Sequence, residues 1–448
     1  HIASTGRPGP VVVDVTKDAQ QASVVPNWDV TLDLEGYEDH RKNDVDLAPV
    51  RAAAELLAAA ERPLILVGNG VIQSGATSEL LALAERTGIP VITTLHGLGA
   101  FPQDHPLSLG MPGMHGWVHV NRAIQRCDVL LNVGSRFDDR VTGKAATFAP
   151  HAKIIHVDVD PSEIGKLVPV AVGIVGDAKA AIDALLEVLR EREADGSGSP
   201  DVRNWLDEVH DLRAKFEPRQ AYRRRPDSAT LQPHDVCALL NAARLTRGPV
   251  RIVTDVGQHQ MWAAQLLDWS KPRTHLTSGG SGTMGFAVPA ALGAAVACPD
   301  ETIWVIVGDG GFQMTNQEIA TMAQEGLTNV KIAIMNNGYL GMVRQWQQLF
   351  EGKRYSGTPL TGPDFAKLAE AYGVRGITAE TTEQAEAAIG DAWDHPGVVV
   401  IDFRVEREAN VFPIVPQGQS IGEMLVDPTT KAAHHEPAAA GAASGSAR

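Results

Sequence analysis

Two short motifs place oxygen-bearing groups directly after apolar stretches. They are Val307-Gly308-Asp309-Gly310-Gly311-Phe312 and Met335-Asn336-Asn337-Gly338. The 25 residues from Gly311 to Met335 are enough for one helix and one strand. Asp309 and Asn337 are therefore expected at the ends of adjacent or nearby parallel strands, at one edge of a sheet. A carboxylate, an amide oxygen and a backbone carbonyl suit Mg²⁺, which prefers oxygen ligands and keeps phosphate or water as further ligands.

Glycines at the start of a helix indicate a phosphate site beside this metal. Gly310 and Gly311 open the helix that follows Asp309, so bare backbone N–H groups at its positive end can meet a phosphate. Either motif alone is usually only a turn. Both motifs together, each directly after an apolar strand, favour a binding site.

Two neighbouring segments point to the same edge. Gln258 and His259 follow another predicted strand and begin a helix, where both can donate to phosphate oxygens, although a lone Gln or His is more often a cap or a surface residue. The loop at residues 277–285 contains Gly282 and Met284 and is too rich in glycine for packing alone. Such a backbone admits a ligand closely, whereas Met284 taken alone would be read as core filler.

The elements that must position these groups alternate between strand and helix. The amino-terminal half has apolar strands at 63–68, 129–134, 154–158 and 172–177, with helices at 49–61, 78–87 and 178–192. The carboxyl-terminal half has strands at 250–255, 302–307, 330–335 and 398–403. This alternation predicts an α/β fold with two doubly wound parallel-sheet domains, whose ligands lie at the carboxyl ends of the strands.

Composition changes mark the predicted domain boundaries. A linker at 21–46 precedes a central domain at 47–192, and a second linker at 193–228, with a helix at 202–216, precedes a domain at 229–421. Residues 422–448 form a tail that we expect to be disordered from about residue 431.

The amino-terminal residues 1–20 read as a turn at Gly6–Pro10 followed by a buried strand at Val11–Val15. A buried strand needs neighbours on both sides. The strand is either an edge strand of the next domain or the last strand of a domain whose front part is absent.

Charge and cysteine content exclude several classes of protein. Lys and Arg number 39 against 54 Asp and Glu, a net charge of −15, so no basic excess exists to neutralise nucleic acid or an anionic membrane. No stretch approaches the length of a membrane span. The three cysteines, Cys127, Cys237 and Cys298, lie far apart, which argues against a disulfide framework and fits the cytoplasm.

Gly-Asp-Gly followed after about 25 residues by Asn-Asn resembles the fingerprint of the thiamin diphosphate (ThDP) enzyme family. The resemblance implies that Asp309, the side chain of Asn337 and the backbone carbonyl of Tyr339 hold Mg²⁺ against the diphosphate. It also implies that Met284 supports the cofactor in a bent shape, which brings its aminopyrimidine amine beside the thiazolium carbon.

Further segments are similar to the acetolactate synthase family over essentially all of residues 1–420. They are residues 4–10, 110–116, 134–143, 156–161 and 340–346. The resemblance implies carboligation of pyruvate with pyruvate or 2-oxobutyrate. Trp346 would then form a flat wall of the substrate channel that favours 2-oxobutyrate, with Arg140 binding a substrate carboxylate. A buried core tryptophan is the other interpretation of Trp346. A homodimer or homotetramer with its active site at the subunit interface, and a small regulatory subunit, are also implied.

In that family the central domain binds FAD. Arg7 and Arg136 can pair with a diphosphate, and Asp158 or Asp160 can accept from ribose hydroxyls. Asp177 lies at a similar strand end. The resemblance adds Gly113 and His115 to this set and implies a structural flavin.

The resemblance leaves two rivals. One is another ThDP and FAD enzyme such as a pyruvate oxidase, and the other is a non-catalytic nucleotide-binding fragment. The family also needs a glutamate in an amino-terminal pyrimidine-binding domain, and no residue of this sequence matches it. We therefore expect residues 1–20 to be the end of that domain, and the 448 residues alone to be essentially inactive and prone to aggregate.

Overall fold

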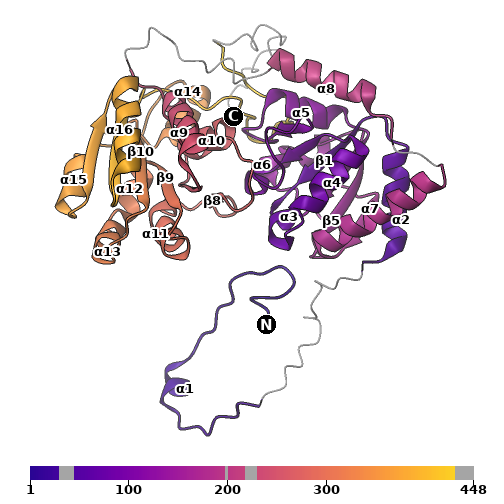
Figure 1. Ribbon diagram of the computed structural model, residues 1–448, viewed down its shortest axis with the longest axis horizontal. Helices are drawn as coiled ribbons and strands as arrows, with labels where there is room; N and C mark the ends of the chain where they lie inside the picture. Colours follow the sequence, from indigo (N-terminus) through magenta and orange to yellow (C-terminus); the bar gives the residue numbers. More distant parts are fainter. Residues whose placement is uncertain (30–44, 197–199, 217–229, 429–448) are drawn as a thin grey trace, which may run out of the picture.

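The computed structural model describes residues 1–29, 45–196, 200–216 and 230–428. Two α/β domains lie side by side in it (Figure 1), and each is built on a six-stranded parallel sheet. The predicted fold class of two doubly wound parallel-sheet domains is confirmed. The central part of the 21–46 linker, residues 217–228 of the second linker and the tail from residue 431 lie outside the described residues.

The first sheet has the strand order β3-β2-β1-β4-β5-β6. Its strands are β1 (Pro63–Val67), β2 (Val91–Thr93), β3 (Ser108–Gly110), β4 (Val129–Val133), β5 (Lys153–Asp158) and β6 (Val172–Val175). The four predicted strands are β1, β4, β5 and β6. Strands β2 and β3 have only three residues each, too few to stand out as apolar stretches.

Helices cover both faces of this sheet because side chains alternate along each strand. Ile65 and Val67 of β1 pack with α2 (Leu47–Ala58), α3 (Asn69–Ser74), α4 (Thr77–Thr87) and α7 (Ala178–Ala194). Leu64 and Leu66 face α5 (Val118–Arg126) and α8 (Arg203–Phe216). The short elements η1 (Leu95–Gly97), α6 (Asp139–Thr142) and η2 (Ala145–Thr147) lie in the connections.

The second sheet has the order β11-β12-β10-β9-β7-β8. Its strands are β7 (Val250–Thr254), β8 (His275–Thr277), β9 (Thr302–Gly308), β10 (Val330–Asn336), β11 (Arg375–Ala379) and β12 (Val399–Arg404). From β7 the chain runs outward to β8 and then returns to β9 on the other side of β7. The order therefore reverses between β7 and β9, which is where sheets of this kind bind ligands.

The second sheet is also covered on both faces. One face packs against α9 (Pro233–Arg247), α10 (Gln258–Leu266) and α16 (Thr382–Asp394). The other packs against α11 (Ala287–Ala297), α12 (Asp309–Thr315), α13 (Glu318–Gln324) and α15 (Phe365–Ala371). Helix α14 (Gly341–Phe350) follows β10.

Residues 405–426, here called the strap, join the two domains. Val405 and Val411 belong to the core of the second domain, whereas Val415, Ile421 and Met424 complete the core of the first. Within the strap, the N–H of Val415 donates to the carbonyl of Met114 at 2.9 Å. The strap therefore begins at the carboxyl end of β12 (Val399–Arg404) and finishes on the first domain.

Residues Val11–Val15 form no strand in this structure, so the interpretation as an edge strand of the next domain is wrong, whereas the interpretation as the last strand of a preceding domain stays a prediction. This segment is neither helix nor strand, and neither six-stranded sheet includes it. Val12 and Val13 are 91% and 78% exposed. A strand exists only with hydrogen-bonded neighbours, and the described part of the chain offers this segment none. The only helix described before residue 30 is α1 (Lys17–Gln21).

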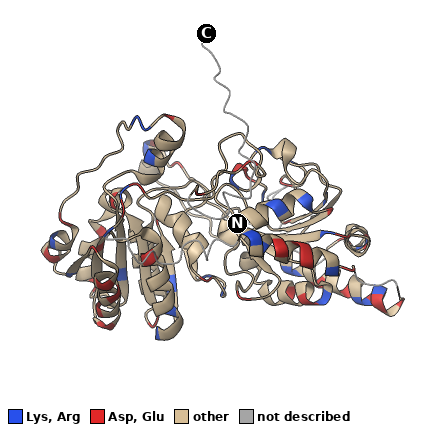
Figure 2. Cartoon of the chain, turned by 90° about the horizontal axis from the view of Figure 1, so that it is seen from above, with Lys and Arg blue, Asp and Glu red and all other residues tan. Residues whose placement is uncertain are grey.

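Charged residues of both signs are interspersed along the outer helices (Figure 2). Ion pairs between neighbouring elements use them, such as Arg51 with Glu191 at 2.8 Å. None of the helices in the described ranges is long and apolar enough to cross a membrane.

Helix α8 is part of the first domain's core, although it lies within the predicted linker at 193–228. Trp205 is 1% exposed, and its indole N–H donates to the carbonyl of Pro63 at 2.8 Å. Replacing Trp205 by Ala should lower the free energy of unfolding by about 3–5 kcal/mol, because it leaves a large cavity and an unpaired carbonyl. Chemical denaturation measures this. Trp28, which is 87% exposed, provides the matched control, since Trp28→Ala should change little.

Candidate active site

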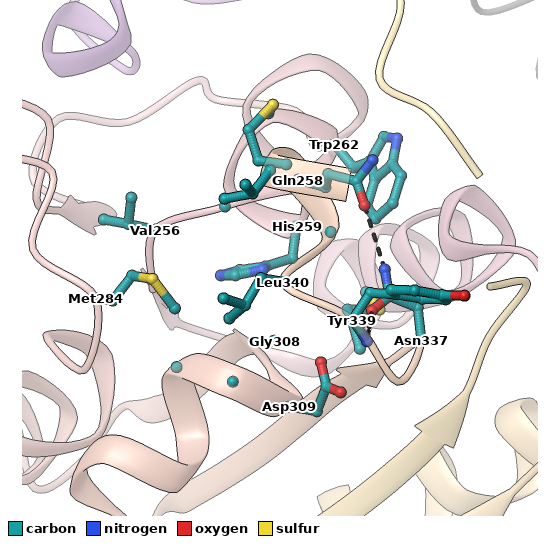
Figure 3. Close-up of a pocket in the computed structure, with 17 residues that line it drawn as sticks. Val256, Gln258, His259, Trp262, Met284, Gly308, Asp309, Asn337, Tyr339 and Leu340 are labelled. Atoms are coloured by element: carbon teal, nitrogen blue, oxygen red, sulfur yellow. Dashed lines mark hydrogen bonds between the residues drawn. The ribbon is translucent and has the colours of Figure 1, made fainter. Parts of the chain in front are cut away.

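A pocket lies at the carboxyl edge of the second sheet, where β7, β9 and β10 end (Figure 3). It is lined by residues 256–259, 308–311, 337 and 339–343, together with Trp262, Met284 and Met335. The register sets this meeting point, because Met335 of β10 pairs with Gly308 of β9 and Thr254 of β7 pairs with Ile306. The prediction that Asp309 and Asn337 share one edge is confirmed.

Asp309 and Asn337 approach each other across the ends of β9 and β10 (Figure 3). Asp309 is 3% exposed, and burial raises the pKa of its carboxyl to about 7, although the backbone N–H groups of Gly310 and Gly338 partly oppose the rise. Asn337 accepts from the N–H of Tyr339 through Oδ1 at 3.1 Å. A buried carboxylate of this kind is costly unless a cation pairs with it.

The described residues contain no group of three or more His, Cys, Asp or Glu that could hold a metal ion. A cation at this pocket would therefore use one carboxylate, an amide oxygen, a backbone carbonyl and oxygens of a ligand. That donor set suits Mg²⁺, which binds few protein side chains and keeps phosphate oxygens.

Glycines allow the backbone segments of the pocket to lie very close together. A Cβ on Gly311 would lie 2.5 Å from Oδ1 of Asp255, and one on Gly341 would lie 2.2 Å from Oε1 of Gln258. Gly310 would meet Leu340 at 2.8 Å. Side chains at these positions are excluded, so the backbone N–H groups at the start of α12 remain accessible from the pocket.

The fully buried carboxylate of Asp255 holds the loop that carries Met284. It accepts from the N–H of Gly285 at 3.0 Å, of Ala287 at 2.9 Å and of Val256 at 2.8 Å. The end of β7, the start of α11 and Met284 are thereby kept together at the pocket. The sequence analysis assigned no role to Asp255, although its position directly after an apolar strand indicated a place at the carboxyl edge of the sheet.

Gln258 and His259 begin α10 and both line the pocket. Burial lowers the pKa of His259 to about 4, so its ring is neutral at pH 7, and its Nε2 is buried without a hydrogen-bond partner among the described residues. An unpaired buried atom of this kind fits a ligand that supplies the partner. The side-chain nitrogen of Gln258 donates to Oε1 of Gln345 at 2.8 Å and to the carbonyl of Ala409 at 2.9 Å.

Three predicted residues do not line this pocket. Trp346, on α14, is partly buried with its ring 4.8 Å from that of Phe350. Gly282 lies in the predicted loop with φ of 63°. Arg140 belongs to the first domain, where its exposed side chain lies 3.6 Å from Asp139 and 3.8 Å from the sulfur of Met114.

The predicted flavin residues lie at the carboxyl side of the first sheet, in two groups. In the first group, Arg7 pairs with Glu163 at 3.0 Å and approaches Asp160 at 3.8 Å. Asp158 accepts from the N–H of Asp160, and burial raises the pKa of Asp158. Asp177 accepts from Lys179 N and caps α7, a role in folding that the sequence analysis did not assign.

The second group surrounds the loop after β3. The N–H of Gly113 donates to Asn121 at 2.8 Å, and the ring of His115 contacts the carbonyl of Pro413 through Nδ1 at 3.1 Å. Burial lowers the pKa of His115 to about 4. Arg136 is exposed and lies three residues after the end of β4. The strap therefore contacts this group as well as the pocket of the second domain.

Two sequence models of the thiamine pyrophosphate enzymes match this chain. The central domain model matches residues 50–185, and the C-terminal TPP binding domain model matches residues 255–403, which include every residue that lines the pocket. Over 432 residues the chain is 49% identical to the acetolactate synthase large subunit of Corynebacterium glutamicum, with 94% of this chain and 66% of the relative covered. The chain belongs to the acetolactate synthase large-subunit family of the thiamine pyrophosphate enzymes.

More distant relatives agree. The acetolactate synthase isozyme 2 large subunit of Escherichia coli is 42% identical over 428 residues, with 95% of this chain and 73% of the relative covered. The probable acetolactate synthase large subunit of Methanocaldococcus jannaschii is 44% identical over 422 residues, with 93% and 70% covered. The chain thus spans roughly two thirds of the length of these family members, 66% in the first case.

Replacing Asp309 by Asn should stabilise the cofactor-free protein at pH 8, by about 2 kcal/mol, because an unpaired buried carboxylate is replaced by a neutral amide of the same shape. Thermal unfolding without added Mg²⁺ or ThDP measures this. Asp300→Asn, at an exposed position, is the control and should leave the midpoint unchanged. An unchanged or lower midpoint for Asp309→Asn would show that the folded protein tolerates this charge without a cation.

Proposed function

We propose that this chain carries out the acetolactate synthase reaction. Pyruvate is decarboxylated with ThDP, and its two-carbon unit is transferred to a second pyruvate or to 2-oxobutyrate. The products, 2-acetolactate and 2-aceto-2-hydroxybutyrate, begin the synthesis of valine, leucine and isoleucine. The observation that carries the proposal is the buried Asp309 beside Asn337 and a glycine-lined helix start, within the ThDP-binding domain of this family.

The metal role falls to Asp309, the side chain of Asn337 and the carbonyl of Tyr339. Together they would hold Mg²⁺ against the diphosphate. The N–H groups at Gly310 and Gly311 would donate to the phosphate, and Nε2 of His259 would gain the partner that it lacks. The pocket fits Mg²⁺ and a diphosphate because Asp309 is its only acidic liner and five of its liners are glycines, at positions 257, 308, 310, 311 and 341.

ThDP, when bound, supplies a carbon nucleophile that attacks the carbonyl of a 2-oxo acid. The chain's own residues place it. Met284 would support the bent cofactor, because Asp255 fixes the backbone on its carboxyl side. Gly282 leaves the same loop free to lie close to the cofactor.

Substrate selection is assigned to Trp346 and Arg140. Trp346 would offer a flat apolar wall to the ethyl group of 2-oxobutyrate, and Arg140 would bind a carboxylate. Neither lines the pocket of a single chain. The exposed apolar side chains Val343 and Phe350, on the same helix as Trp346, support a site that is covered by a second subunit in a homodimer or homotetramer. A small regulatory subunit is part of the same proposal.

The central domain would hold FAD as a structural cofactor, since the net reaction transfers no electrons. Arg7 and Arg136 would face the diphosphate, Asp158 or Asp160 the ribose, and Gly113, His115 and Asp177 the remaining contacts. Two features support the proposal: all of these residues except Arg7 lie at or after the carboxyl ends of strands of a doubly wound sheet, and the strand order reverses between β1 and β4. Arg7 would have to leave Glu163 to reach a flavin.

The metal assignment is tested by binding. Asp309→Ala should weaken Mg²⁺-dependent ThDP binding by about 100-fold or more, because it removes the only carboxylate of the site. Titration calorimetry measures the affinity, and Asp300→Ala serves as the control. Unchanged ThDP affinity in Asp309→Ala would refute the site.

The reaction itself is tested by product analysis, which should find 2-acetolactate, whereas oxygen uptake with pyruvate would indicate an oxidase.

Trp346→Leu should lower the preference for 2-oxobutyrate over pyruvate by about tenfold, because the planar wall is lost and one methylene is worth roughly 1–3 kcal/mol of discrimination. Competition between the two acceptors gives the product ratio directly. Trp28→Leu, at a tryptophan that is 87% exposed and far from α14 in the sequence, is the control. The same product ratio in Trp346→Leu and the parent would place Trp346 outside the channel.

A further inference from the structure

Three side-chain amides connect the strap with the candidate metal loop. They belong to Gln345 on α14, Gln258 on α10 and Asn337 after β10, and they are 0%, 3% and 6% exposed. The connection begins at the backbone of Val411. Because water has little access to these amides, each one must be satisfied by its neighbours.

The backbone of Val411 fixes the orientation of the first amide. Its N–H donates to Oε1 of Gln345 at 2.8 Å, and its carbonyl accepts from Nε2 of Gln345 at 2.9 Å. A backbone N–H can only donate and a backbone carbonyl can only accept. Gln345 can therefore satisfy Val411 in one orientation only.

The orientation of the Gln345 amide in turn fixes that of the Gln258 amide. Its Nε2 donates to Oε1 of Gln345 at 2.8 Å and to the carbonyl of Ala409 at 2.9 Å. Both partners are acceptors, so the nitrogen of Gln258 must face them. Its oxygen is then left to accept from Nδ2 of Asn337 at 3.2 Å (Figure 3).

Asn337 consequently keeps its Oδ1 on the other side of the amide. That oxygen is the atom a cation requires, and the nitrogen would repel one. We propose that Gln345 is a positioning residue, which together with residues 409–411 of the strap sets the orientation of the Asn337 amide for metal binding. The inference rests on the metal role of Asn337 given under Proposed function.

A purely structural role for Gln345 would be to hold the strap, and two substitutions separate the roles. Gln345→Glu keeps an oxygen that accepts from Gln258 and from the N–H of Val411, so the orientation of Asn337 survives. It sets a buried carboxylate against the carbonyl of Val411, which costs stability. Gln345→Met removes the acceptor for Gln258 while adding no buried charge.

The test measures the Mg²⁺ concentration for half-maximal ThDP binding, by quenching of tryptophan fluorescence, and the unfolding temperature without cofactors. Gln345→Met should raise the Mg²⁺ requirement by about tenfold, and Gln345→Glu by less than about threefold. Gln345→Glu should nevertheless unfold at the lower temperature. A Mg²⁺ requirement that follows the order of stability, or that stays at the parent value in Gln345→Met, would overturn the proposal.

Further variants keep the result decisive. In an Asn337→Asp background both terminal atoms are oxygens, so Gln345→Met should change the Mg²⁺ requirement by less than about twofold. If Gln345→Met does not fold, Gln258→Met removes the acceptor for Asn337 and leaves the contacts between Gln345 and Val411 intact. The Mg²⁺ requirement should again rise by about tenfold. A Mg²⁺ requirement equal to that of the parent would contradict the proposal. Gln324→Glu, at an exposed glutamine, is the control. A null effect of Asp309→Ala would instead refute the metal site itself.

Discussion

The parallel register of the second sheet is the constraint on which the site depends. Because Met335 of β10 pairs with Gly308 of β9, these two strands end at the same level of the sheet. Strand β7 pairs with β9 on its other side. Three unrelated loops therefore meet at one edge. The fully buried carboxylate of Asp255 then joins the end of β7 to the start of α11 through three backbone N–H groups. A shift of one residue between β9 and β10 would turn the side chains of one strand to the opposite face of the sheet and separate the levels of Asp309 and Asn337.

The long apolar strands could be predicted from the sequence, because both faces of a parallel sheet are buried and each strand is a continuous apolar run. Strands β2, β3 and β8 have three residues each, and β11 is half polar. Their existence depends on the neighbours that they pair with, which local patterns do not reveal. The same reason explains why Val11–Val15, an apolar run, is no strand of the described sheets, which provide it no neighbour.

Residues of the site that follow strands directly could also be predicted, since the fold class alone sends them to one edge. Gln345 and Arg344 could not. They look like the polar face of a surface helix, yet Arg344 is fully buried and donates to the carbonyl of Ala409 at 2.7 Å and to Asn410 at 3.0 Å. These contacts join residues about 65 positions apart. Short-range patterns of polarity contain no trace of such partners.

The path of the strap has a consequence for the order in which the protein is made. The first domain leaves the ribosome early, but its core includes Val415, Ile421 and Met424. Those residues are synthesised only after every strand of the second sheet. Until then the part of the first domain that the strap contacts, around Met114, Gln125 and Gly143, is left uncovered. The first domain thus reaches its final packing only after the second domain has been synthesised, and a ribosome that stalls within the second domain leaves both domains incomplete.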